Sequence, residues 1–247
     1  MQPTDARRGF VVKNPESAVA AFPATLSTRD FLVSEGIEDL PLARKWMCTK
    51  LKTRGLSENI VSAFRIVPRH AFAPRSRWRV AYLDLDLWTG VTWMTSPATV
   101  ARVVSSISFG KSAPHIYEVG TGTAYQTAIM IAMGATVITF DVNPECALKA
   151  RLLFQTLGVS NVAARLGNGF FLPPQGEKFD AIIVNAVIPE FPTRLIGLLK
   201  KTGGVIIAPV LVADGSQRLI RYSFSEDGSY LAINLGMCRF APAVLQR

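Results

Sequence analysis

The sequence predicts an α/β protein with a mostly parallel, seven-stranded sheet and helices on both of its faces. From residue 116 onward, short apolar runs alternate with helix-length segments. Most of these runs are largely apolar without a regular alternation, as strands covered on both faces are. Two later runs are separated by turn residues, which is typical of an antiparallel hairpin. With 49% hydrophobic and 18% charged residues among 247, the chain has ample material for one large core.

The first 50 residues are expected to form a helical N-terminal extension, and residues 51–247 the main domain, whose core lies at about 114–210. The beginning of the extension mixes Pro, Ser, Thr and charges with weak periodicity. From Pro41 to Phe72, apolar residues recur at near-helical spacing, and Gly55 is expected to separate two short helices.

The remaining helices and strands are expected in alternation. Pro97 is expected to begin a helix that runs to Ile107, because Pro is favoured in a first helical turn. Two lysines and two glycines within residues 200–204 suit the end of the last helix, and residues 226–229 suit a hairpin turn. The expected strands are Ile116–Val119, Thr136–Phe140, Asn161–Arg165, Phe179–Val184, Val205–Pro209, Arg218–Phe224 and Tyr230–Phe240. The expected helices between them are Gln126–Met133, Glu145–Leu157 and Thr193–Lys200.

Charge and cysteine content argue against several classes of protein. The net charge is +9, and residues 1–80 hold 14 Lys and Arg against 7 Asp and Glu. This asymmetry fits a solvated basic face or a polyanionic partner, but no run of five like charges occurs. The three cysteines form no CxxC pair and only two histidines are present, so neither a disulfide framework nor a metal site is expected.

Targeting signals are also missing from the pattern. The longest nearly apolar stretch, Gly203–Ala213, is too short for a membrane span, which needs about 20 residues. The first 13 residues do not resemble a signal peptide. We therefore expect a cytoplasmic protein that does not insert into a membrane.

A glycine-rich turn follows the first expected strand of the sheet. Residues 118–125 read Glu-Val-Gly-Thr-Gly-Thr-Ala-Tyr and open a helix. Glycines at Gly120 and Gly122 allow a tight turn and a close approach of the backbone to a ligand. Asp141 ends the next strand, at the distance where an acidic side chain accepts hydrogen bonds from ribose hydroxyls. This context predicts a nucleotide site in a Rossmann-like fold.

The acid in front of the glycines favours one nucleotide over another. Glu118 at the end of the strand would repel a pyrophosphate but could face a sulfonium or an ammonium group. This favours S-adenosylmethionine over NAD. Asn168 and Gly169, after the third strand, would lie beside the adenine edge or form a plain turn.

Five ordered segments extend this reading over most of the chain. They are Val-Pro-Arg-x-x-Phe at 67–72, Ala-Tyr-x-Asp at 81–84, the glycine loop at 118–128, Phe-Asp-Ala-Ile-Ile-Val at 179–184, and a block with Gly-Gly and Pro-Val at 199–210. With these segments the chain resembles the protein-L-isoaspartate (D-aspartate) O-methyltransferase family from about Leu56 to Leu245. The resemblance implies an S-adenosylmethionine-dependent enzyme that methylates a carboxylate of a peptide or protein, as in protein repair.

The resemblance also implies the site residues. Thr95 stands where the family has the Ser of a Ser-x-Pro motif, and it would orient the carboxylate as the catalytic residue. Asp141 replaces a ribose-binding Glu, Asn168 replaces an Asp, Ala124 replaces a third loop glycine, and Phe240-Ala241-Pro242 loosely matches a late Val-Pro segment. The implied cofactor-binding residues are Trp93, Met94, Ser96, Glu118, Gly120, Thr121, Gly122, Tyr125, Asp141, Val142, Asn168, Gly169 and Gln217.

Methylation of a carboxylate needs no general base, because a group with a pKa of about 4 is already ionised at neutral pH. Three alternatives stay open at this point. The acceptor could be a dedicated peptide or a small-molecule carboxylate. The basic first third could indicate an RNA or DNA methyltransferase, although residues 185–189 lack the adjacent prolines and aromatic residue common in amino-methylating enzymes. The fold could also serve as a binding module without activity.

Overall fold

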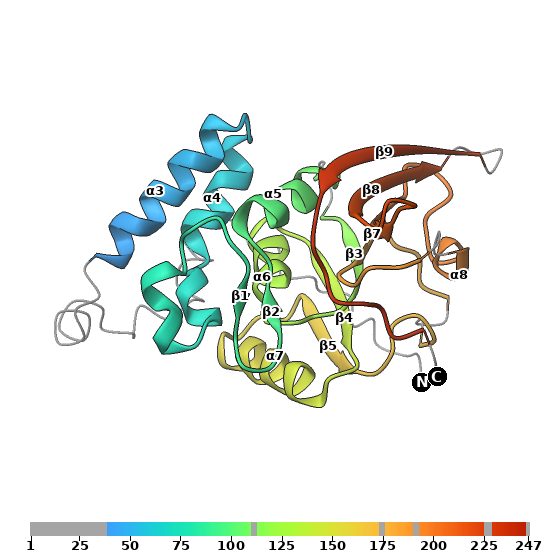
Figure 1. Ribbon diagram of the computed structural model, residues 1–247. Coiled ribbons are helices and arrows are strands. Elements are labelled where there is room, and N and C mark those ends of the chain that lie inside the picture. The colour runs from blue at the N-terminus through green and yellow to red at the C-terminus, as the bar shows by residue number, and fades with distance from the viewer. Residues whose placement is uncertain (1–38, 110–112, 173–175, 190–192, 225–228, 246–247) are drawn as a thin grey trace, which may run out of the picture.

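The computed structural model describes residues 39–109, 113–172, 176–189, 193–224 and 229–245 (Figure 1). Its helices are α3 (Leu40–Thr53), α4 (Glu58–Ile66), α5 (Pro97–Ser105), α6 (Tyr125–Ala132), α7 (Pro144–Thr156) and α8 (Thr193–Ile196), with 3-10 turns η1 (Arg69–Phe72) and η2 (Arg75–Val80). A small hairpin consists of β1 (Leu87–Trp88) and β2 (Trp93–Met94). The strands of the main sheet are β3 (His115–Val119), β4 (Thr136–Asp141), β5 (Val162–Leu166), β6 (Ala181–Val184), β7 (Val205–Leu211), β8 (Gln217–Phe224) and β9 (Tyr230–Met237).

The main sheet has seven strands in the order β5-β4-β3-β6-β7-β8-β9. The five strands from β5 to β7 are parallel, while β8 and β9 are antiparallel to their neighbours. The chain reverses its direction of progress across the sheet between β3 and β6. Ligands of open α/β sheets bind at such a point, beyond the carboxyl ends of the strands. The predicted mostly parallel seven-stranded sheet is confirmed.

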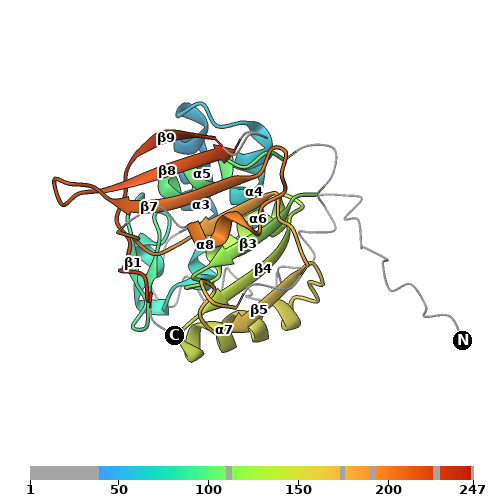
Figure 2. The ribbon, with the colours of Figure 1, turned by 90° about the vertical axis from the view of Figure 1, so that its right-hand side faces the viewer.

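Alternate residues of the strands enter two separate cores, one on each face of the sheet. Ile116 packs with helices α3 to α7 on one face, whereas its neighbour Tyr117 packs on the other face. Helices α5 to α7 lie nearest to the sheet on the first face, and α3 and α4 lie outside α5 and α6 (Figures 1 and 2). Over the described residues, the second face carries only the short helix α8, together with loop residues such as Phe170 and Phe179.

The helix expected from Thr193 to Lys200 is wrong in its second half. Helix α8 ends at Ile196, and the chain then pairs with Phe179 through a parallel bridge at Leu199. The backbone of this stretch bonds with Phe179 instead of continuing the helix: Phe179 N–H donates to the Leu198 carbonyl at 2.8 Å, and Lys200 N–H donates to the Phe179 carbonyl at 2.9 Å. Residues 200–204 are therefore a turn before β7, and Lys200 pairs with Asp180 at 2.7 Å instead of capping a helix.

The other expected elements agree with the structure within a few residues. Gly55, at φ +82°, separates α3 from α4 as predicted. Strand β9 ends at Met237 and not at Phe240, and the predicted turn at 226–228 lies outside the described residues. Helix α3 runs through the expected boundary between residues 50 and 51 and buries Leu51 in the first core. The division of the chain into an extension and a domain stays a prediction.

The described residues contain neither a helix suited to a membrane span nor a cluster of metal-binding side chains. No helix among them is long and apolar enough to cross a membrane. No group of three or more His, Cys, Asp or Glu side chains among them could hold a metal ion.

Candidate active site

A cavity of about 200 Å³ lies at the carboxyl ends of the parallel strands. Loops after β3, β4, β5 and β6 form one side of it, and the β1–β2 hairpin and the segment after β9 form the other. The predicted site residues that line it are Trp93, Thr95, Gly120, Thr121, Gly122, Tyr125, Asp141, Val142, Asn168 and Gly169. The predicted residues of the β1–β2 hairpin region and those at the carboxyl ends of the parallel strands therefore line the same cavity.

The glycine loop after β3 lies close to the loop after β6. Gly120 has φ +92°, and a Cβ atom there would come within 3.2 Å of the Cβ of Asn185. Only glycine combines this backbone conformation with such a close approach. Ala124 also adopts left-handed backbone angles, at φ 65° and ψ 5°, immediately before α6. The two loops are thereby held together at the floor of the cavity.

Glu118 lies beneath this loop and does not line the cavity. Its fully buried carboxylate accepts hydrogen bonds from the Thr127 hydroxyl at 2.6 Å, from Asn185 Nδ2 at 3.0 Å and from Gln126 Nε2 at 3.2 Å. Burial raises the pKa of Glu118, and these donors oppose that shift. Asn185 Nδ2 also donates to the Gly120 carbonyl at 2.9 Å. In this arrangement Glu118 holds β3, α6 and the loop after β6 together.

Asp141 lies at the opposite end of the glycine loop, at the end of β4. Its Oδ2 accepts a hydrogen bond from Gly122 N–H at 2.7 Å, and its Oδ1 accepts one from Asn143 N–H at 2.8 Å. A carboxylate offers about four lone-pair positions, so both oxygens can accept a further hydrogen bond. Asp141 therefore fixes the loop and can still receive two hydroxyl groups from a ligand.

The C-terminal strap, residues 238–244, closes the far side of the cavity. The red segment descends from β9 and turns across the strands toward the C-terminus (Figure 1). Gln217 bonds with Phe240 twice, accepting from its N–H at 2.7 Å and donating to its carbonyl at 3.1 Å. Asn168 Nδ2 donates to the Val244 carbonyl at 2.8 Å, and Val187 bonds with the backbone of Ala241 and Ala243. Gln217 thus supports the strap without lining the cavity.

Arg69 holds the opposite wall, which carries Thr95. This fully buried guanidinium donates to the carbonyls of Thr95 at 2.6 Å, Ala81 at 2.7 Å and Leu85 at 3.1 Å. It also lies over the Tyr125 ring, 5.0 Å from the ring centroid. One side chain therefore fixes three points along the segment that ends at Thr95 and connects that segment to α6.

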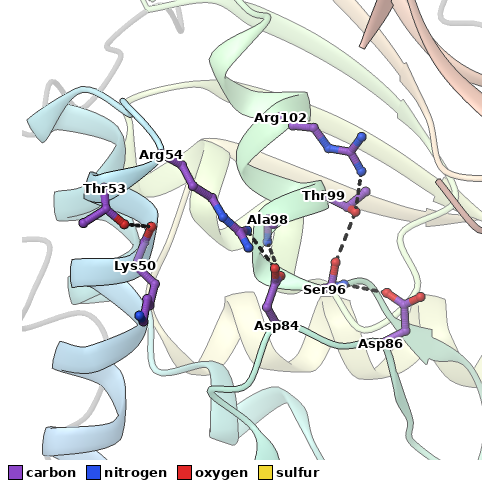
Figure 3. A network of polar contacts seen from close by, with 9 residues as sticks. All are labelled: Lys50, Thr53, Arg54, Asp84, Asp86, Ser96, Ala98, Thr99 and Arg102. Atoms are coloured by element: carbon purple, nitrogen blue, oxygen red, sulfur yellow. Dashed lines mark hydrogen bonds and ion pairs between the residues drawn. The ribbon is translucent and has the colours of Figure 1, made fainter. Parts of the chain in front are cut away.

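Ser96 and Met94 flank Thr95 but point elsewhere. Met94 is buried in the first core. Ser96 donates from its hydroxyl to Thr99 at 3.1 Å, and its N–H donates to Asp86 at 2.7 Å (Figure 3). Asp84 accepts from Ala98 N–H at 2.9 Å and pairs with Arg54 at 2.7 Å in the same network. The two aspartates thus satisfy free N–H groups at the start of α5 and fix the residues that follow Thr95.

The cavity also includes residues that the sequence argument did not select. They include Asp86, Thr92, Gln126, Asn185, Ala186, Arg239 and Val244, whereas Phe240, Ala241 and Pro242 were noted only as a loose match to a Val-Pro segment. Asn185 and Ala186 follow β6 directly, so the rule that ligands bind at the carboxyl ends of strands could have identified them. Apart from that loose match, no local pattern indicates the strap, because its backbone bonds with residues far away in the sequence.

Comparisons with known proteins agree with this geometry. Residues 43–247 match the family model for protein-L-isoaspartate(D-aspartate) O-methyltransferase. The protein-L-isoaspartate O-methyltransferase of Xanthobacter autotrophicus is 34% identical over 198 residues, which cover 78% of this chain and 88% of the relative. That of Magnetococcus marinus is 34% identical over 211 residues, covering 83% and 90%.

Solved structures lead to the same family. A structure of a protein-L-isoaspartate O-methyltransferase superposes with a TM-score of 0.72 at 25% identity, covering 81% of this chain and 66% of that one. A structure from Plasmodium falciparum, described as a protein of this kind in complex with S-adenosyl-L-homocysteine, has a TM-score of 0.68 at 20% identity and shares the fold, with 82% and 99% covered. The match to the family model and the identity to these relatives place the chain in the protein-L-isoaspartate(D-aspartate) O-methyltransferase family.

Proposed function

We propose that this protein transfers the methyl group of S-adenosylmethionine to an isoaspartyl or closely related carboxylate of a peptide or protein. The main support for this proposal is the arrangement of residues on the two walls of the cavity. The glycine loop and Asp141 form one wall, while Thr95 stands on the other, held by Arg69. A nucleotide-binding wall facing a fixed hydroxyl is the arrangement that methyl transfer between two bound molecules needs.

The side chains and backbone of the cavity suit an adenosyl cofactor. Asp141 has acceptor capacity for two ribose hydroxyls, and Val142 after it offers an exposed apolar surface to a purine ring. Asn168 uses its side chain on Val244 and Phe170, so an adenine edge would meet the backbone near Gly169 instead. We propose that Glu118 acts indirectly, by fixing the loop after β3.

The cofactor supplies an electrophilic methyl group on a sulfonium centre. The residues of this chain have to align a carboxylate oxygen with that group and keep water away. The Thr95 hydroxyl can donate one hydrogen bond to the acceptor carboxylate and so restrict its rotation. Positioning of this kind can supply about 7–11 kcal/mol of a reaction barrier. No base is required, since the acceptor is ionised at neutral pH.

One structural observation speaks against a nucleic-acid base as the acceptor. The Asn185 amide, which follows β6, bonds with Glu118, Gly120 and Gln126. Its hydrogen-bonding capacity is therefore used within the protein and is not directed to a base. A dedicated carboxylate other than isoaspartyl stays the second candidate, because Thr95 carries a methyl group that narrows the acceptor side. A cytoplasmic location stays a prediction.

The test uses two peptides that differ only in Asp or isoAsp, with labelled S-adenosylmethionine. Label released by alkali as methanol counts methyl esters, and we expect it from the isoAsp peptide alone. Thr95→Ser should keep the rate within a few fold, whereas Thr95→Val, which has the same shape without the hydroxyl, should lower kcat by about 10- to 100-fold, the value of one hydrogen bond to a charged group. Equal rates for the Ser and Val variants would contradict the role of Thr95. Cofactor binding without label on either peptide would favour the second candidate.

A further inference from the structure

The β1–β2 hairpin exposes two tryptophans next to the cavity. Strand residues alternate between faces, and here Leu87 and Met94 point into the core while Trp88 and Trp93 point outward. Trp88 and Trp93 are directly opposite each other in the antiparallel register. Their ring centroids are 5.4 Å apart, and the two side chains form one aromatic surface, which we term the tryptophan pair.

The tryptophan pair leaves much apolar area in water. Trp88 is 41% exposed and Trp93 is 57% exposed. A cross-strand aromatic pair stabilises a hairpin, which gives the tryptophan pair a modest structural role. That role alone does not require two large rings on the solvent side, since β-branched residues also suit such positions. Adjacent exposed apolar side chains commonly mark a binding surface.

The hairpin that carries the pair is rigid. Across its turn, Thr89 N–H and the Thr89 hydroxyl both donate to the Thr92 carbonyl, at 2.9 and 2.7 Å. At its base, Arg69 bonds with the carbonyls of Leu85 and Thr95, one on each side of the hairpin. A surface held in this way loses little conformational entropy when it binds a partner.

The position of the pair identifies its partner. Trp93 and Thr95 both line the cavity, so the surface continues from the acceptor side of the cavity to the outside. Consecutive Cα atoms of a peptide are about 3.8 Å apart, so a residue next to a carboxylate held at Thr95 would lie over the hairpin. We propose that the tryptophan pair binds an apolar or aromatic side chain one or two residues from the methyl-accepting carboxylate in a peptide substrate. This inference rests on the proposed function, and it assigns the substrate class as peptides with an apolar residue beside the acceptor.

The experiment measures binding and methyl transfer separately on the same peptides. The peptides contain one isoAsp and differ only in the adjacent residue, which is Phe, Leu or Ser, on either the N-terminal or the C-terminal side. Their dissociation constants are measured by calorimetry with S-adenosylhomocysteine present, and their kcat and KM with S-adenosylmethionine. For one of the two sides, we expect the Phe peptide to bind about tenfold more tightly than the Ser peptide, from the size of an aromatic contact.

Two tryptophan variants separate the proposal from a structural role. Trp88→Thr keeps a residue suited to a strand but removes one ring, and it should reduce the ratio between Phe and Ser peptides to within about twofold. Trp46→Ala removes a tryptophan of similar exposure, 47%, from α3 and should leave the ratio unchanged. If Trp88→Thr lowered the stability of the protein and weakened the binding of all peptides equally, the pair would have a structural role and the proposal would be overturned.

The remaining outcomes are also distinct. Binding that favours Phe in the absence of any methyl transfer would support the tryptophan pair as a peptide site while the proposed reaction fails. Methyl transfer that does not depend on the adjacent residue would support the reaction and overturn the inference. A dimer in sedimentation that Trp88→Thr dissociates would assign the pair to a second copy of the chain and would likewise overturn it.

Discussion

Arg69 is the side chain whose removal tests most directly how the acceptor wall is built. The variant Arg69→Met places an apolar side chain of similar length at this position and removes every hydrogen-bond donor of the guanidinium. The three carbonyls of Ala81, Leu85 and Thr95 would then lose a charged partner at 2.7, 3.1 and 2.6 Å. A hydrogen bond to a charged group contributes about 1.5–3 kcal/mol, while desolvation of the guanidinium offsets part of the total.

We therefore expect Arg69→Met to lower the free energy of unfolding by about 3–5 kcal/mol, because three buried carbonyl groups lose their donor at about 1–3 kcal/mol each, and the avoided desolvation of the guanidinium offsets part of this loss. This is a large part of the 5–15 kcal/mol typical of a folded domain. Arg69 fixes the Thr95 segment and contacts the cofactor side of the cavity only through the Tyr125 ring, so kcat should fall by a larger factor than cofactor affinity. Arg69→Lys should recover only part of the loss, since an ammonium group cannot reproduce the planar fork of donors.

The assay is urea unfolding of the variants, together with cofactor calorimetry and methyl transfer at a temperature where all of them are folded. Arg65→Met is the matched control, because Arg65 is an exposed arginine of α4 that pairs with Glu58, and such pairs contribute about 0–1 kcal/mol. A loss of less than about 1 kcal/mol for Arg69→Met, or an unchanged kcat, would refute the reasoning, since three charged hydrogen bonds could not then be in place.

Three further predictions concern other parts of the structure. Burial lowers the pKa of His70 from 6.5 to about 4, so the unfolded chain binds more protons than the folded one between these pH values. The free energy of unfolding should therefore fall as the pH drops through this window, by up to about 3 kcal/mol. In urea unfolding from pH 7.5 to 4.5, His70→Gln should remove most of this pH dependence, and His115→Gln should remove less of it, since the His115 side chain is 29% exposed. Asp141→Asn should weaken cofactor binding by about tenfold or more, because an amide turns one acceptor into a donor facing an N–H group; calorimetry that finds unchanged affinity would contradict the place given to this carboxylate. Gln217→Ala should lower the hydrogen-exchange protection of the Phe240 amide by about 1–2 kcal/mol of opening free energy, whereas the amides of β3 should stay protected.

The sequence was sufficient for the parts of the fold that depend on burial. Strands such as Val205–Pro209 are apolar on both sides, and the first residue of β7 was located correctly. The sequence was insufficient where the same residue pattern is compatible with a helix and with a non-helical chain. Leu195, Leu198 and Leu199 have helical spacing, and all three are buried in the core on the second face. The helix nevertheless ends at Ile196, because the backbone at Leu198 and Lys200 pairs with Phe179, and this pairing is visible only in three dimensions.

The candidate site divides in the same way. Residues at the ends of consecutive parallel strands, such as Gly120, Asp141 and Asn168, meet because of the topology, and the sequence predicted their proximity. The direction of a side chain at a strand end could not be predicted. Glu118 was expected to face the ligand, but its carboxylate points to Thr127 and Asn185 beneath the loop. The strap was noted only as a loose match to a Val-Pro segment, because its contacts are made mainly by backbone atoms, which leave no residue pattern.

The contacts of the strap and of strand β9 have a consequence for the order in which the protein folds. Asn168 reaches Val244 across 76 positions of the chain, and Arg102 Nη1 reaches the Leu235 carbonyl across 133. Contacts between residues so distant in sequence close large loops and form slowly, whereas helices form locally within microseconds. In a refolding experiment, helical circular dichroism should therefore recover well before the ability to bind the nucleotide. No single segment of the chain forms the cavity, so a folding intermediate that contains most of the helices would still be unable to bind the ligand.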